Sequence, residues 1–144
     1  GSLYISEMAG QTLSSEEINA VLKDQKKEIQ RRIQILRHGR PFTDIKGRTV
    51  ILADDGIATG ATLFASIKLC KEKKAGKIVV AAPISGERMD TLLRSEVDDV
   101  IILEKPPYYS AVSQGYEDFS NLSDEEAVAF MDKWEKEYHP KTAK

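Results

Sequence analysis

Apolar residues in the first third of the chain recur at the spacing of an α-helix. Residues 14–38 carry a single stripe of this kind, which predicts one long amphipathic helix. Ser14 and Glu17 fit a capping box at its start, and Gly39 followed by Pro41 ends it. The stripe consists of Ile18, Val21, Leu22, Ile29, Ile33 and Leu36.

Three short apolar runs follow, each bounded by turn residues. They predict strands at residues 48–53, 77–83 and 100–103, with helices at 59–74 and 86–97 between them. This order of elements indicates two consecutive right-handed βαβ units and therefore a parallel sheet. Because the run at 48–53 is continuously apolar, we expect that strand to be buried on both faces.

The last part of the chain is less regular. Pro106 and Pro107 exclude a helix there, and Ser123 begins a capping-box pattern for a final helix. The packing side of that helix is expected to carry Val128, Phe130, Met131 and Trp134. Between these segments, Tyr116 and Phe119 either cover a planar ligand or pack in the core, and we favour the core.

Composition narrows the class of protein. The chain has 144 residues, 41% of them hydrophobic and 31% charged, and a net charge of −2. These values predict one globular domain over residues 3–139, with neither nucleic acid nor membrane as a partner. Residues 1–2 read as a tag remnant and residues 140–144 as a tail. The single Cys70 is expected to be a packed core thiol and agrees with a cytoplasmic location.

Several charged residues are weaker candidates for a site. Ligands of open parallel sheets bind beyond the carboxyl ends of the strands. We therefore expect one edge of the sheet to gather Asp54, Asp55, Ser85, Glu87 and Lys105. The end of the long helix is basic, with Arg31, Arg32, Arg37 and His38, followed by Arg40. Most of these cations are expected to be solvated, since cations are favourable at a helix C-terminus.

The most informative segment is Val50 to Thr62. A buried strand leads to two adjacent carboxylates, Asp54 and Asp55, and then through small residues into a helix. Carboxylates can accept hydrogen bonds from sugar hydroxyls or help to hold a divalent metal ion. Free amides at a helix N-terminus favour a phosphate. Together these features describe a site for a ribose 5-phosphate. The alternative is an ordinary strand-to-helix turn in which the acids are solvated and Thr59 caps the helix.

Other phosphate-binding motifs fit this segment poorly. The chain has no Gly-x-Gly-x-x-Gly, and the loop lacks the lysine of a P-loop. Instead, the segment resembles the 5-phosphoribosyl-1-pyrophosphate (PRPP) loop of the type I phosphoribosyltransferases. The segments around Lys46, Tyr116 and Ser123 look like one bacterial branch of that family. The resemblance implies a Rossmann-like parallel sheet, truncated at its N-terminal side and preceded by a long helix.

The resemblance also implies roles for individual residues. Asp54 and Asp55 would contact the ribose hydroxyls with the help of Mg²⁺, and they are the tentative catalytic residues. Substrate binding would further involve Gly56, Ala58, Thr59, Gly60, Ala61 and Thr62. A nitrogen nucleophile would displace pyrophosphate from C1 of PRPP. Because Ala58 stands where oxopurine enzymes carry an acid, an oxopurine acceptor is disfavoured.

The expected activity depends on the missing N-terminal part of the domain. We expect the parent protein to be a transferase, whereas this chain binds ribose 5-phosphate or PRPP but is weakly active or inactive. Without its neighbour, the strand at 48–53 would have an open edge, which predicts a homodimer or an exchanged assembly. The alternatives are a non-catalytic PRPP-sensing regulator and a receiver-like phospho-acceptor domain. A receiver-like domain would need an additional acid at the end of the next strand and a lysine further along, and Ser85 and Lys105 do not meet these requirements.

Overall fold

The computed structural model describes residues 14–138, which divide into two compact units. The first comprises residues 43–119, and the second comprises residues 14–42 together with 120–138. None of the helices within residues 14–138 is long and apolar enough to cross a membrane. The predicted tag remnant and tail lie outside the described residues, and the single domain over residues 3–139 stays a prediction.

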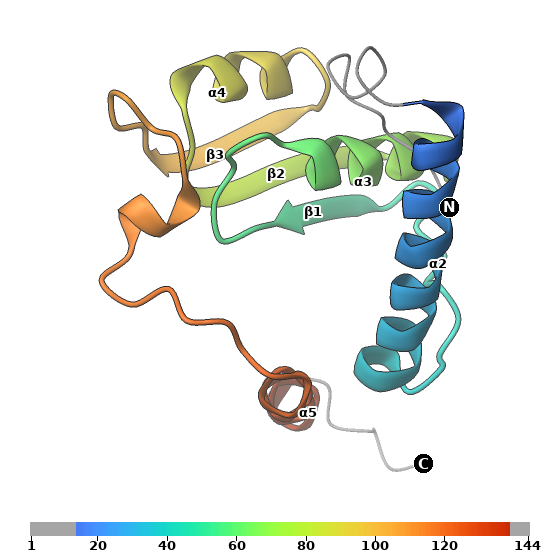
Figure 1. Ribbon diagram of the computed structural model, residues 1–144. Helices are drawn as coiled ribbons and strands as arrows, with labels where there is room; N and C mark the ends of the chain where they lie inside the picture. The colour runs from blue at the N-terminus through green and yellow to red at the C-terminus, as the bar shows by residue number, and fades with distance from the viewer. Residues whose placement is uncertain (1–13, 139–144) are drawn as a thin grey trace. The chain divides into compact units, whose positions relative to one another are not determined.

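The first unit is built on a parallel sheet of three strands, β1 (Thr49–Ala53), β2 (Lys77–Ile84) and β3 (Asp99–Glu104), in the order β1-β2-β3 (Figure 1). Leu52 lies beside Val80 in the register of β1 and β2. The predicted parallel α/β sheet with consecutive crossovers is thus confirmed. Among the described residues, β1 is an edge strand of this sheet, as predicted.

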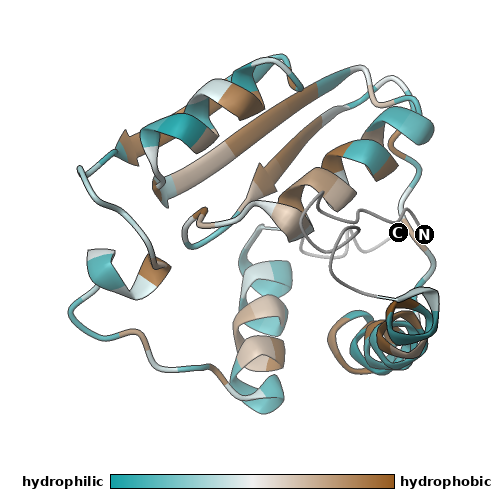
Figure 2. Ribbon diagram, turned by 45° about the horizontal axis from the view of Figure 1, so that its top comes forward, coloured by the Kyte–Doolittle hydropathy of each residue, from teal (hydrophilic) through white to brown (hydrophobic). Residues whose placement is uncertain are grey.

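One face of the sheet packs against the helices α3 (Ala61–Glu72) and α4 (Glu87–Arg94). The core is formed by Ile57, Leu63, Ile67, Val80, Ala82, Leu93 and Val100. In Figure 2 the brown colour of the strands shows this apolar content. Cys70 on α3 is 4% exposed, and burial raises the pKa of its thiol, as expected for a packed cysteine.

The prediction that the first strand is buried on both faces is wrong for the described residues. Successive side chains of a strand point to opposite faces, and α3 and α4 pack on one of them. On the other face, Ile51 is 65% exposed, Ile101 51% and Leu103 74%. The apolar run correctly predicts a strand, but it does not indicate whether other elements cover both faces of that strand.

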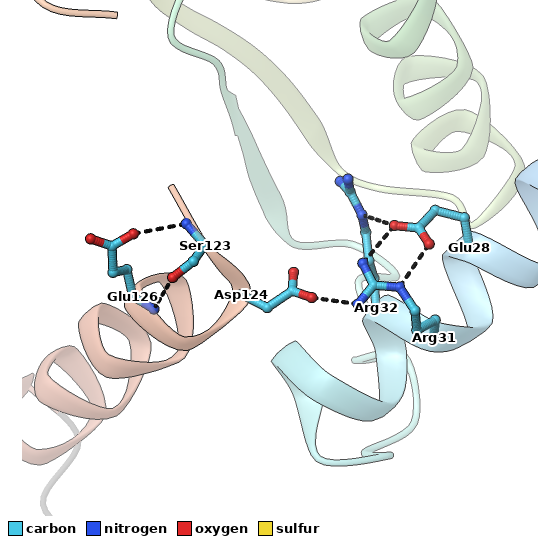
Figure 3. Close-up of polar contacts among 6 residues, drawn as sticks. All are labelled: Glu28, Arg31, Arg32, Ser123, Asp124 and Glu126. Carbon is cyan, nitrogen blue, oxygen red and sulfur yellow. Dashed lines mark hydrogen bonds and ion pairs between the residues drawn. The ribbon is translucent and has the colours of Figure 1, made fainter. Parts of the chain in front are cut away.

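The second unit consists of α2 (Ser15–Arg37) and α5 (Asp124–Tyr138). Both predicted capping boxes are present. The Ser14 amide donates to Glu17 (2.9 Å), and the Ser123 amide donates to Glu126 (2.8 Å). The second of these caps and the ion pair that joins Arg31 to Asp124 are drawn in Figure 3. The helix boundaries therefore follow the local sequence signals.

Neither helix of this unit has a buried residue. The predicted packing side of α5 is exposed, with Phe130 at 63% and Trp134 at 54%. Charge pairs, by contrast, occupy the basic end of α2: Arg31 and Arg32 bind Glu28 (Figure 3), and Arg40 binds Glu135 (2.6 Å). These arginines are partly exposed, as expected, and they are paired with carboxylates of the same unit.

Candidate functional site

The acid pair lies directly beyond the carboxyl end of β1 and is held by main-chain hydrogen bonds to β2. The Asp54 amide donates to Ala81 (3.1 Å), and the Ile57 amide donates to Ile84 (3.0 Å). Between these two anchors, the Asp54 carboxylate accepts the Asp55 amide (3.1 Å). The chain therefore leaves the sheet in a fixed turn that presents both carboxylates at the surface.

The negative charge of this pair is uncompensated by described residues, none of which forms a salt bridge with Asp54 or Asp55. The pKa of Asp54 is raised, mainly by partial burial and also by the neighbouring Asp55 charge, while the hydrogen bond from the Asp55 amide opposes the shift. A cation or a hydrogen-bond donor in a ligand would relieve this repulsion.

The donor set fits Mg²⁺ that is shared with a ligand. Within residues 14–138 no group of three or more potential metal-binding side chains occurs, so a cage made by the protein alone is not formed there. Mg²⁺ is commonly held by one or two carboxylates while waters and substrate phosphates complete its shell. Asp54 and Asp55 match that partial shell, and their uncompensated charge is the observation that supports the fit.

The loop of small residues ends at a helix start that no side chain caps. Gly60 occupies the N-cap position of α3 in the left-handed region (φ 69°) and has no side-chain cap hydrogen bond. The first bond of the helix runs from the Phe64 amide to Gly60 (2.8 Å). The alternative in which Thr59 caps the helix is wrong, and α3 begins at Ala61, two residues later than predicted.

The exposed residues of this segment are Asp54, Asp55, Ala58, Thr59, Ala61 and Thr62, whereas Gly56 is buried and Gly60 is half-buried. An exposed acid pair and exposed residues at a helix N-terminus therefore occur within nine consecutive positions, Asp54 to Thr62. The carboxylates suit hydroxyl groups or a cation, and the helix start suits an anion. All predicted site residues belong to this continuous segment.

Two residues predicted at the same edge of the sheet have structural partners instead. Ser85 is fully buried, and its hydroxyl donates to the Ile57 carbonyl (3.3 Å). Lys105 forms an ion pair with Asp90, a residue of α4 that is 6% exposed. Glu87 lies in the first turn of α4 and is exposed.

Two opposing effects act on the buried carboxyl of Asp90. Burial pushes its pKa upward, and this is the largest single effect. The hydrogen bond from Lys105 and the ion pair with Arg94 together outweigh it, so the pKa of Asp90 lies below its ordinary value. Lys105 is therefore the counter-charge of a buried acid.

The contact that the sequence did not predict is made by Tyr116. Its hydroxyl donates to the main-chain carbonyl of Asp55 (2.6 Å), and its ring lies 5.2 Å from the ring of Phe119. The expectation that both aromatics pack in the core is wrong, because Phe119 is 43% exposed and Tyr116 is bonded to the acid loop. The sequence indicates a polar and aromatic loop, but it does not indicate that this loop contacts the Asp55 carbonyl.

A second phenol lies near the acid pair. The Tyr109 hydroxyl is buried and has no hydrogen-bond partner among the described residues. Burial raises its pKa, and the charges of Asp55 and Asp54 act in the same direction. In the segment after β3, Tyr116 thus contacts the main chain of the acid loop, and Tyr109 lies within the electrostatic range of both carboxylates.

Comparison with known proteins agrees with this arrangement. Residues 5–117 match the model of the phosphoribosyl transferase domain. Over 129 residues the chain is 36% identical to a provisionally named phosphoribosyl transferase of Mycobacterium tuberculosis (strain H37Rv), a match that covers 90% of this chain and 29% of that protein. It is also 31% identical over 64 residues to the transcriptional regulator GfcR of Methanosphaera stadtmanae, a match that covers 44% of this chain and 32% of the regulator.

A solved structure shares the fold. The crystal structure of TT1426 from Thermus thermophilus matches with a TM-score of 0.71 and 28% identity, over 90% of this chain and 62% of that chain. The chain thus spans less than a third of the Mycobacterium tuberculosis relative and less than two thirds of TT1426. Because the family model covers well over half of its residues, the chain belongs to the phosphoribosyl transferase domain family.

Proposed function

We propose that the segment Asp54–Thr62 binds the ribose 5-phosphate part of PRPP, and that the parent protein transfers this phosphoribosyl group to a nitrogen acceptor with release of pyrophosphate. The observation that carries the proposal is the proximity in the chain of two carboxylates without a counter-charge among residues 14–138 and a helix start without a side-chain cap. Family membership supports the same ligand class.

Each part of the segment has a separate task in this proposal. Asp54 and Asp55 accept hydrogen bonds from the ribose hydroxyls and would hold Mg²⁺, directly or through PRPP. When bound, Mg²⁺ supplies positive charge to the leaving pyrophosphate. The amides and hydroxyls of the remaining residues hold the 5-phosphate: Gly56, Ala58, Thr59, Gly60, Ala61 and Thr62.

The acid pair also suits the reaction at C1. Positive charge develops on the ribose ring as pyrophosphate leaves, and fixed carboxylates close to that ring stabilise it. Main-chain bonds to Ala81 and Ile84 hold the turn on both sides, so little reorganisation is needed when the charge forms. We propose a base or an amine as the acceptor, and Ala58 disfavours an oxopurine among the bases.

Calorimetry with PRPP and Mg²⁺ tests the binding step. We expect saturable binding by the wild-type chain and at least tenfold weaker binding by Asp54→Asn/Asp55→Asn, since each lost charge-assisted hydrogen bond is worth about 1.5–3 kcal/mol. The control is Glu16→Gln/Asp24→Asn, which removes two carboxylates from α2. Equal affinity in all three proteins, or no binding in any, would contradict the proposal.

The second candidate function is a non-catalytic PRPP sensor, and the similarity to the regulator GfcR favours it. The two functions differ in turnover. A transferase releases pyrophosphate when PRPP and a suitable acceptor are supplied, whereas a sensor binds PRPP without release. We further propose that this chain by itself has weak or no activity. Robust pyrophosphate release by the 144-residue chain would contradict that part.

We also propose a homodimer or an exchanged assembly. Among the described residues β1 has an unpaired edge, and Ile51 is exposed on its open face. Both support the proposal, because unpaired strand edges and apolar patches favour association. Light scattering should give a dimeric mass that Ile51→Lys lowers. A monomeric mass at high concentration would exclude the assembly. The cytoplasmic location stays a prediction.

A further inference from the structure

A hydrogen bond joins two segments that are far apart in the sequence. The Tyr116 hydroxyl reaches the main-chain carbonyl of Asp55, 61 residues earlier, at 2.6 Å. We propose that Tyr116 is a positioning residue, which sets the orientation of the acid pair toward the ribose. This inference rests on the proposed function of that pair.

Close packing determines where Tyr116 lies. The short 3₁₀ helix η1 (Val112–Gly115) ends directly before it. A Cβ at Gly115 would lie 2.5 Å from Ile84, and a Cβ at Gly56 would lie 2.5 Å from Val112, so the backbone at both glycines lies directly against its neighbour. The segment after β3, orange in Figure 1, is thereby fixed against the end of β2 and the acid loop.

The hydroxyl of Tyr116 completes the set of contacts in the turn. Main-chain bonds of Asp54 and Ile57 fix its two ends, but neither of them includes the peptide between Asp55 and Gly56. The bond from Tyr116 to the Asp55 carbonyl fixes that peptide. Since the peptide orientation sets the direction of the adjoining side chain, it also sets where the Asp55 carboxylate points.

Removal of the hydroxyl alone separates this role from packing. Tyr116→Phe keeps the ring that lies against Phe119 and deletes only the donor. Tyr108→Phe is the matched control, because Tyr108 lies in the same segment and is 97% exposed. Both variants lose one phenolic oxygen, but only one of them loses a bond to the acid loop.

The experiment uses two probes in the presence of Mg²⁺. PRPP engages both the acid pair and the phosphate loop, whereas inorganic phosphate, measured as a competitor, engages the phosphate loop alone. We expect Tyr116→Phe to weaken PRPP binding about three- to tenfold, the value of one hydrogen bond, and to leave the inhibition constant of phosphate unchanged. Tyr108→Phe should match the wild type with both probes.

The outcomes separate the inference from the proposed function. If the wild type binds PRPP and Tyr116→Phe binds it equally well, the inference is wrong and the proposed function stands. If Tyr116→Phe loses affinity for both probes equally, or unfolds, the role of Tyr116 is structural and the inference is overturned. If no protein binds PRPP, the proposed function fails and the inference fails with it.

Discussion

Gly56 lies so close to Val112 that a Cβ at residue 56 would be 2.5 Å from Val112 Cγ1. The contact joins the loop after β1 to the 3₁₀ helix η1, and Ile84 of β2 lies on the same side, 2.9 Å from that position. The acid pair is thus one residue away from a point where three segments of the chain meet. A substitution at Gly56 would transmit its effect to Asp55.

Gly56→Ala is expected to lower the free energy of unfolding by about 1–3 kcal/mol, the usual cost of an overpacked site. It should also weaken PRPP binding, because relief of the clash requires either the acid loop or η1 to move. Urea unfolding followed by circular dichroism measures the first effect and calorimetry measures the second.

A compensating variant tests whether Val112 is the cause. Val112→Ala removes both methyl groups that a Cβ at residue 56 would contact, at 2.5 and 3.1 Å. We expect Gly56→Ala/Val112→Ala to be more stable than the sum of the single changes predicts, since contacting residues are not additive. Full additivity would show that the two residues do not interact.

Gly60→Ala should affect both stability and ligand binding. Gly60 has φ +69°, which costs a residue with a side chain about 1–2 kcal/mol, and its Cβ would lie 2.9 Å from Met89 Sδ. Gly47→Ala is the matched control, with φ +70° and no atom within 4 Å. Unfolding and phosphate binding of both variants are the measurements.

The difference in phosphate affinity between Gly60→Ala and Gly47→Ala separates an effect at the start of α3 from the backbone strain that both variants share. Both should lose stability through backbone strain, but only Gly60→Ala should also weaken phosphate binding, because Gly60 adjoins the helix start. Equal phosphate affinity in the two variants would mean that the N-terminus of α3 does not hold the anion.

The local structure of the candidate site was predictable from the sequence because its residues are consecutive; their role in binding stays a prediction. The strand end at Ala53, the acid pair and the helix start at Ala61 follow one another along the chain, and each of these has a local sequence signal. Tyr116 was not predictable in its role, because its partner is a main-chain carbonyl 61 residues away. The spacing of apolar residues predicts which of them share a face, but it does not predict which distant group a tyrosine side chain contacts.

In the fold, too, features with a local sequence signal were predictable and features that depend on distant contacts were not. The order of strands and helices followed from local patterns, whereas the exposure of Ile51 did not, because burial depends on what packs over each face. Lys105 is a similar case. Its position beyond β3 indicated a possible ligand contact, and its actual partner is Asp90 on α4.

Lys105→Met is therefore expected to destabilise the fold without changing ligand affinity. Loss of one partner of a buried pair usually costs about 3–5 kcal/mol, and we expect about 2 kcal/mol because Arg94 still contacts Asp90 (3.1 Å). Lys71→Met is the control, since it breaks an exposed pair with Glu96 that is worth less than about 1 kcal/mol. Urea unfolding of the two variants compares them.

The pH dependence gives a second check on Asp90. Its pKa is lowered in the folded state, so the stability it contributes is present above its unfolded pKa and is lost as the pH falls through its folded pKa. The deficit of Lys105→Met should therefore shrink in acid. A deficit that is independent of pH, or a loss of PRPP affinity, would contradict the structural role of Lys105.

Asp54→Asn should have opposite effects on stability and on binding. The pKa of Asp54 is raised in the folded state, chiefly by partial burial, so its ionisation costs folding free energy once the pH rises above the ordinary value of about 3.9. The amide removes this cost. We expect the variant to unfold at a higher temperature than the wild type at pH 7, with the difference vanishing below about pH 3.9, where both side chains are neutral.

Because the cost reflects a carboxylate with no counter-ion among the described residues, PRPP with Mg²⁺ should stabilise the wild type more than the variant. Thermal unfolding across pH, with and without PRPP and Mg²⁺, measures both effects. A variant that is less stable than the wild type at pH 7 would mean that the Asp54 carboxylate serves the fold instead of the ligand.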